Sequence, residues 1–263
     1  GDTPQKIWDV KAGVGSSKDS MLLASPIVID GKVFVLDSKG MLKAFNLSDG
    51  SSIWERSLKP AENSVYSGAI ASDSRYIFVT LGSGELVCIK SSDGSEVWRT
   101  SIKSPLRGGA TVVDDRIYVV TIDNKTLSFS AKTGQRLWTH SGAAESAALI
   151  GGGSPSVKSN VVVVSYSSGE VFGLKAETGR GFWADHLGAD NRLNGVGNIA
   201  DINGSPVIDR GLVFNISNSG RLLATELRTG GRIWERAISG ANTPWIAGDF
   251  IFIISNEGQI ICL

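Results

Sequence analysis

The chain has 263 residues, and 41% of them are hydrophobic, which is enough for a substantial core. Its 26 basic and 26 acidic residues cancel, and the basic residues are dispersed, which argues against a nucleic-acid or membrane-surface partner. No uninterrupted apolar stretch reaches the roughly 18 residues that a membrane-spanning helix needs.

A recurring tryptophan is the most regular feature along the chain. Trp8 comes first, at the end of the degenerate copy PQKIW (4–8), and five later tryptophans each stand four residues after the glycine of an Asp-Gly or Thr-Gly pair. Successive tryptophans are 46, 44, 40, 45 and 51 residues apart, and a period in that range indicates a repeat architecture. The five complete copies are DGSSIW (49–54), DGSEVW (93–98), TGQRLW (133–138), TGRGFW (178–183) and TGGRIW (229–234).

Each period holds three further runs of strand-forming residues before the tryptophan strand. The first complete unit reads SPIVID (25–30), KVFVLD (32–37) and MLKAFNL (41–47), with Gly, Asp and Ser at the turns. Such short β-branched and aromatic runs predict antiparallel hairpins. The second run of each unit is apolar almost throughout, so we expect it to be covered on both faces. Four antiparallel strands per repeat predict an all-β fold, a β-propeller of four-stranded blades, as one domain over residues 1–263.

The tryptophan and its glycine have a structural role in this interpretation. The glycine permits the positive φ of the turn, and the large ring packs against the adjacent blade. The predicted docking residues are Gly50, Gly94, Gly134, Gly179, Gly230 and Trp54, Trp98, Trp138, Trp183, Trp234.

The two ends of the chain leave the ring undecided. Trp8 ends a unit whose inner strands do not precede it, and residues 235–263 supply three strands without a fourth. The sequence therefore predicts five complete blades plus parts of a sixth. Pairing of the N-terminal strand with the tail would close a six-bladed ring and remove exposed edges. The alternative is a truncated larger ring.

Little in the sequence predicts catalysis or a cofactor. Cys88 and Cys262 lie in apolar runs four repeats apart, so we expect two buried, free thiols. His140 and His186 follow tryptophan strands of different units without a third histidine, so we expect no transition-metal site. The glycines at 151–153 lead into a strand and not into a phosphate-binding helix. No carboxylate pair stands out as a general acid and base.

The pattern A-x-N/D-x-x-D/T-G-x-x-x-W, complete in residues 44–54 and closely matched in 224–234, resembles the docking motif of quinoprotein-type (PQQ-like) propellers. Within that superfamily, residues 151–174 and 192–236 are similar to the middle blades of the BamB family, lipoproteins of the outer-membrane β-barrel assembly (BAM) machinery. The resemblance implies a non-catalytic, eight-bladed scaffold without a cofactor. It also implies a periplasmic, outer-membrane-associated location in a Gram-negative bacterium, with membrane attachment only through a lipid anchor upstream of this chain. On that basis we favour the truncated ring.

The same resemblance implies docking on the POTRA domains of BamA through two inter-blade loops. In the first, Leu149 matches the second leucine of a Leu-x-Leu-Arg stretch, while Ala147 and Ile150 replace its first leucine and its arginine. In the second, Asp201 matches the first residue of an Asp-x-Asp pair and Asn203 replaces the second.

The residues alone direct attention to the second loop as well. Residues 184–204 form the longest connection in the chain, and long loops in compact domains usually have a function. The alternative is an ordered loop that plugs its own blade interface. The expected partner face contains Leu149, Ile150, Arg192, Leu193, Asp201 and Asn203.

Other functions stay open at this point. Exposed sheet edges also suit strands of unfolded outer-membrane proteins. A PQQ-dependent dehydrogenase would resemble this fold, but this chain has no Cys-Cys pair of the kind found in those enzymes. A ligand-sensing domain of a membrane receptor is the third class.

Overall fold

The computed structural model describes residues 3–16, 24–58, 68–143, 152–187 and 202–263. In these ranges the regular secondary structure is strand alone, arranged as antiparallel sheets in which the order of the strands follows the sequence. No helix in the described ranges is long and apolar enough to cross a membrane.

Five sheets have four strands each and one has three. The first contains β1 (Ile27–Ile29), β2 (Lys32–Leu36), β3 (Met41–Asn46) and β4 (Ser52–Ser57). The second contains β5 (Ala69–Ser72), β6 (Tyr76–Leu81), β7 (Glu85–Lys90) and β8 (Glu96–Ser101). The third contains β9 (Thr111–Val113), β10 (Arg116–Val120), β11 (Lys125–Ser130) and β12 (Arg136–Ser141). The fourth contains β13 (Ser156–Lys158), β14 (Val161–Ser165), β15 (Glu170–Lys175) and β16 (Gly181–His186). The fifth contains β17 (Val207–Asp209), β18 (Leu212–Ile216), β19 (Leu222–Glu226) and β20 (Arg232–Arg236), and the sixth β21 (Trp245–Ala247), β22 (Phe250–Ile254) and β23 (Ile260–Cys262).

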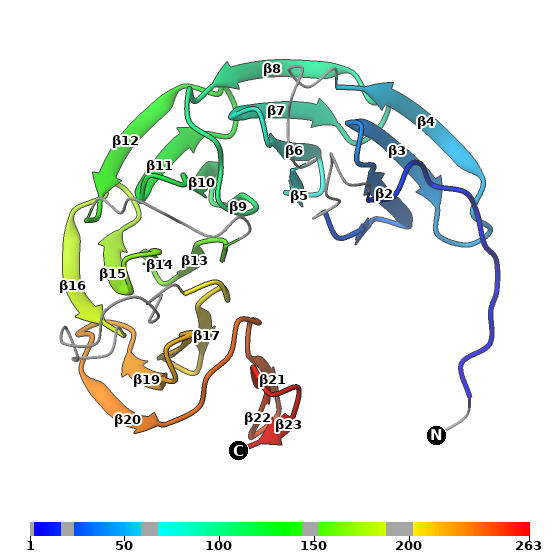
Figure 1. Cartoon of the computed structure of the whole chain (residues 1–263). Coiled ribbons are helices and arrows are strands. Elements are labelled where there is room, and N and C mark those ends of the chain that lie inside the picture. Colours follow the sequence, from blue (N-terminus) through cyan, green and yellow to red (C-terminus); the bar gives the residue numbers. More distant parts are fainter. Residues whose placement is uncertain (1–2, 17–23, 59–67, 144–151, 188–201) are drawn as a thin grey trace.

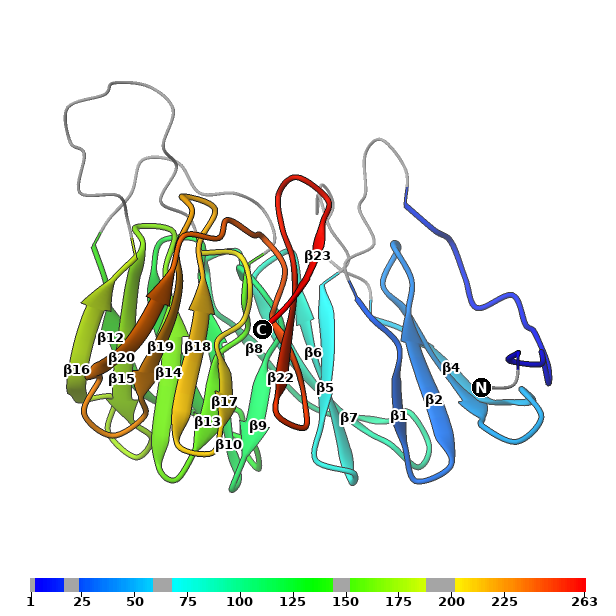
Figure 2. The same cartoon turned by 90° about the horizontal axis from the view of Figure 1, so that it is seen from below.

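The sheets stand side by side around a centre, with the first strand of each innermost and the fourth outermost (Figure 1). Their strands run between the two faces of the assembly (Figure 2). The prediction of an all-β fold built from four-stranded antiparallel, blade-like sheets is confirmed, and the described residues form five such sheets and one of three strands.

The outer strands carry the tryptophans, and Trp54, Trp98, Trp138 and Trp183 each contact the next sheet. A Cβ placed on Gly94, Gly134, Gly179 or Gly230 would collide with the indole of the preceding sheet, and each of these glycines has φ between +70° and +73°. The indole N–H donates to the backbone carbonyl three residues before that glycine, as in Trp183 to Leu227 O at 2.8 Å and Trp138 to Ala176 O at 2.9 Å. Trp234 packs on Phe214 of its own sheet, with ring centroids 5.8 Å apart.

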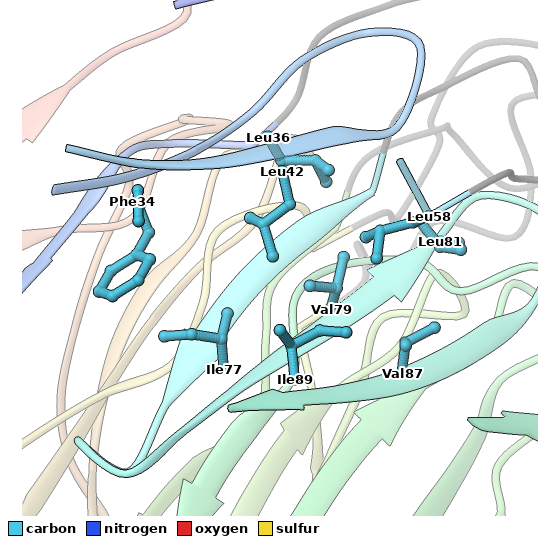
Figure 3. Close-up of a cluster of buried hydrophobic side chains, with 10 residues drawn as sticks. Phe34, Leu36, Leu42, Leu58, Ile77, Val79, Leu81, Val87 and Ile89 are labelled. Atoms are coloured by element: carbon cyan, nitrogen blue, oxygen red, sulfur yellow. The ribbon is translucent and has the colours of Figure 1, made fainter. Parts of the chain in front are cut away.

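The core lies between neighbouring sheets. Between the first and second sheets, strands β2, β3, β6 and β7 contribute the buried side chains Phe34, Leu36, Leu42, Ile77, Val79, Leu81, Val87 and Ile89 (Figure 3). The second strands β6, β10, β14 and β18 are almost entirely buried, as predicted, and every residue of β14 is buried. The prediction is wrong for β22, where Phe250 and Ile254 are exposed because no further sheet is described beyond the sixth.

The alternative of a closed six-bladed ring is wrong for this structure. Trp8 packs on Gly50 and donates to Leu47 O at 2.9 Å, but residues 3–16 form no strand, and β23 pairs with β22 alone among the described strands. The two ends of the chain lie on opposite sides of an opening in the arc (Figure 1).

Both cysteines are free, as expected, but only Cys88 is buried. Cys262 is exposed because β23 forms the last described edge of the sixth sheet, where no further sheet covers it. In the fifth sheet the equivalent residue is the buried Ala224. The expectation of a buried Cys262 was therefore wrong.

Candidate partner-docking site

Most of the expected partner face falls in two loops outside the described residues. Leu149 and Ile150 belong to residues 144–151, and Arg192, Leu193 and Asp201 belong to residues 188–201. The structure describes the residues on either side of each loop, which we call the loop roots: 142–143 and 152 for the first, and 186–187 and 202–203 for the second. The second loop is shorter than expected, since β16 continues to His186.

The N-terminal root of the first loop is held by two polar side chains. Glu170 Oε2 accepts the backbone N–H of Ala143 at 2.7 Å, and Gly142 donates its N–H to the carbonyl of Asn124 at 2.9 Å. The Asn124 carboxamide donates to Ala143 O at 2.9 Å. Its oxygen also accepts from the backbone and hydroxyl of Ser167, at 3.1 and 2.9 Å. The third and fourth sheets thus share one hydrogen-bonded network at this root.

The N-terminal root of the second loop contacts the same turn of the fourth sheet, residues 167–170, which follow β14 and end on the first residue of β15. Leu187 donates its N–H to Gly169 O at 2.8 Å, and His186 Nε2 lies 3.0 Å from Ser168 O. From the fifth sheet, Arg232 reaches Asp185 with two nitrogens, at 2.9 and 2.6 Å. Both loops therefore leave the body beside one anchored turn.

The C-terminal roots meet at Arg107, which precedes β9. Its guanidinium donates to Ile202 O at 3.0 Å and to Asn203 Oδ1 at 3.3 Å. Its own carbonyl accepts the N–H of Gly152 at 2.7 Å. Asn203 is half-buried, and it is the one expected partner-face residue that the structure describes.

His140 and Tyr166 contact each other between the third and fourth sheets, close to the first root. Their rings stack at 11°, and His140 Nδ1 lies 3.1 Å from the Tyr166 hydroxyl, which is also 2.7 Å from Thr126 Oγ1. Burial lowers the pKa of His140 and raises that of Tyr166, so both groups favour their neutral forms. No cluster of three metal-ligating side chains occurs in the part of the chain that the structure describes.

A central pocket of about 540 Å³ lies among the innermost strands and the segments leading into them. Its described lining consists of apolar residues, glycines, hydroxyl side chains, Asn203 and Arg107, without a carboxylate or a cysteine. Calcium prefers carboxylate and carbonyl oxygens, and a quinone-dependent oxidation needs a base. These lining residues do not fit a PQQ–calcium centre.

Arg107, Glu170 and Asn124 were not among the residues singled out from the sequence. Their roles depend on contacts across 19 to 96 positions, which a local pattern does not reveal. The one local signal is the glycine pairs at 108–109 and 152–153, because a Cβ on Gly108 or Gly152 would collide with the other segment.

The blades, their docking tryptophans and the loop roots define a β-propeller of the PQQ-like repeat class. A family model described as "Outer membrane protein assembly factor BamB" matches residues 38–263, and the chain belongs to that family. BamB of Vibrio cholerae is 31% identical over 258 residues, which cover 97% of this chain and 66% of that protein. The chain spans about two thirds of the length of the curated relatives it matches.

Solved structures agree on the fold. The crystal structure of BamB from Moraxella catarrhalis superposes with a TM-score of 0.81 at 17% identity, covering 91% of this chain and 72% of that one. A quinohemoprotein alcohol dehydrogenase from Pseudomonas putida HK5 superposes with a TM-score of 0.60 at 13% identity, covering 86% of this chain and 43% of that one.

Proposed function

We propose that this chain is part of a non-catalytic scaffold in the BAM complex, located in the periplasm and associated with the outer membrane. It docks on the POTRA domains of BamA through the loops at residues 144–151 and 188–201. Leu149, Ile150, Leu193, Arg192 and Asp201 provide the contacts, and no cofactor takes part.

One observation carries this proposal: the two loops leave the body beside a single turn. Glu170 and Asn124 fix the first N-terminal root, and the carbonyls of Ser168 and Gly169 fix the second. Fixed roots reduce the conformational freedom that the loops lose on binding, which favours affinity. Loops on a rigid scaffold are also where binding residues concentrate.

The test is calorimetric titration of the chain with the POTRA domains of BamA from the same organism. Saturable binding that is lost in a Leu149→Asp, Asp201→Ala double variant would support the proposal and locate the face. The matched control is Val65→Asp, Glu62→Ala, which places the same types of substitution in the loop at residues 59–67 and should bind like the parent. No saturable heat with the parent chain, or equal loss in both double variants, would contradict the proposal.

A further inference from the structure

Arg107 is a charged side chain in the interior of the protein, since only 1% of its surface is exposed. Its backbone is fixed within the third sheet, where its N–H donates to Val120 O at 2.8 Å and the neighbouring Leu106 bridges to Thr121. A buried guanidinium is costly unless hydrogen bonds compensate it, so its acceptors indicate its role.

Its hydrogen bonds join two segments that are about 50 residues apart in the sequence. Gly152 is the first described residue after the loop at 144–151, and its N–H binds the Arg107 carbonyl at 2.7 Å. Ile202 is the first described residue after the loop at 188–201, and its carbonyl accepts from Arg107 Nη2 at 3.0 Å. One residue in the segment that leads into β9 therefore holds the C-terminal ends of both loops.

The surrounding backbone is shaped for this contact. A Cβ on Gly152 would collide with the Arg107 side chain, and a Cβ on Gly108 would collide with the carbonyl of Gly152. Glycine at both positions allows the segment after the first loop to approach the arginine closely.

Asn203 takes part in the same arrangement. Its Oδ1 lies 3.3 Å from Arg107 Nη2 and, like Arg107, it lines the central pocket. The planar guanidinium presents several N–H donors in a fixed geometry, so one nitrogen reaches both the Ile202 carbonyl and the Asn203 carboxamide. A lysine ammonium is a single point charge on a flexible stem and lacks this fork.

We propose that Arg107 is a positioning residue that sets the two docking loops relative to each other by holding both of their C-terminal roots. Asn203 serves as an internal acceptor for Arg107 in this arrangement and not as a partner contact. The inference rests on the proposed docking function, because positioning has a consequence for affinity only if these loops bind the partner. Arg107 is then a second fixed point for the loops, in addition to the turn at 167–170 that holds their N-terminal roots.

The chain offers a matched control for this role. Arg99 Nη2 donates to Leu58 O at 3.0 Å, and Leu58 is the last described residue before the loop at 59–67. Arg99→Met therefore removes an arginine from a loop root that the proposed function does not use, whereas Arg107→Met removes it from the two docking roots.

Two measurements test the proposal on the full chain. In titration with the BamA POTRA domains, Arg107→Met should weaken binding about tenfold or more through lost preorganisation, and Arg99→Met should change it less than about twofold. In limited trypsinolysis under native conditions, cleavage after Arg192 should accelerate in Arg107→Met and stay at the parental rate in Arg99→Met. Arg107→Lys should fall between the parent and Arg107→Met in both assays.

The outcomes distinguish a failure of the positioning role of Arg107 from a failure of the proposed docking function. Parental binding and a parental cleavage rate in Arg107→Met would overturn the proposal. If the parent chain binds no POTRA domain, the docking function fails and the cleavage rates alone decide whether Arg107 anchors the second loop. If Arg107→Met does not fold, as judged by circular dichroism, Asn203→Ala replaces it. That variant should weaken binding and accelerate cleavage, and parental values for both would refute the role of the pair.

Discussion

Replacing Trp183 by alanine should be among the most destabilising single changes in the protein. Its side chain is 9% exposed and packs with Val213, Leu223 and Leu227 of the fifth sheet. Truncating a buried tryptophan costs about 3–5 kcal/mol of unfolding free energy. Part of that cost comes from the Leu227 carbonyl, which loses the indole N–H at 2.8 Å, a bond that contributes about 1 kcal/mol.

Trp8 is an internal control for this prediction. It makes the same two contacts with the next sheet, a glycine under the ring and a carbonyl at 2.9 Å from the indole nitrogen, but it is only half-buried. Trp8→Ala should cost about 1–2 kcal/mol, because the hydrogen bond is lost but little buried volume is. The difference between the two variants measures what burial between sheets contributes.

Urea unfolding followed by far-ultraviolet circular dichroism gives both values, provided that the m-values of the variants match that of the parent. A Trp183→Phe variant keeps most of the apolar contact and should cost about 1–2 kcal/mol. If Trp183→Ala is no more destabilising than Trp8→Ala, inter-sheet burial of the tryptophans is not a main source of stability.

Three further outcomes are expected. Gly179→Ala should lower the melting temperature more than Gly31→Ala: both glycines have φ near +70°, but a Cβ meets the docking indole only at Gly179 and open space at Gly31. Equal shifts in thermal unfolding would remove the steric explanation. Cys262 should react with a thiol reagent in the native protein, whereas Cys88 should react only after unfolding, because burial and then the nearby Asp73 carboxylate raise its pKa to about 12. Two fast thiols in a stopped-flow assay would contradict this. Burial lowers the pKa of His140, so the unfolded chain binds its proton more readily, and its contribution to stability should fall as the pH drops through about 6.5. A His140→Gln variant should lose less stability than the parent between pH 7 and pH 5, and an equal loss would argue against this linkage.

The sequence was sufficient to predict the repeat because the repeat is a local pattern. An Asp-Gly or Thr-Gly turn fixes a positive φ, and a tryptophan four residues later lies on the outer strand, as in Gly179 and Trp183. Continuous apolar runs such as residues 161–164 predicted strands covered on both faces, and β14 is covered in this way. These signals depend on residues within one repeat.

The features that the sequence did not predict depend on contacts between distant parts of the chain. The exposure of Cys262 depends on which sheet stands next to β23, and its apolar neighbours in the sequence gave no sign of that. The burial of Arg107 depends on acceptors 95 and 96 positions away. An arginine beside two glycines is usually assigned to a surface turn, since charged residues are rarely buried without partners. The resemblance therefore predicts where the partner face lies, whereas the contacts that hold the loop roots became visible only in the structure.

The indole that reaches across to the next sheet has a thermodynamic consequence. Each blade interacts mainly with its two neighbours, so the unfolding of the arc should follow a nearest-neighbour scheme and not a single concerted step. The β21–β23 sheet has a described neighbour on one side only and exposes Trp245, Ile254 and Ile260, whereas the third and fourth sheets are covered on both sides. Amide hydrogen exchange should therefore be graded along the chain, with the fastest opening in the sixth sheet and the slowest in β10 and β14. Residues 142–143 and 186–187, at the starts of the two loops, follow the last strands of the third and fourth sheets, so partial fraying of the terminal blade leaves these two roots in place.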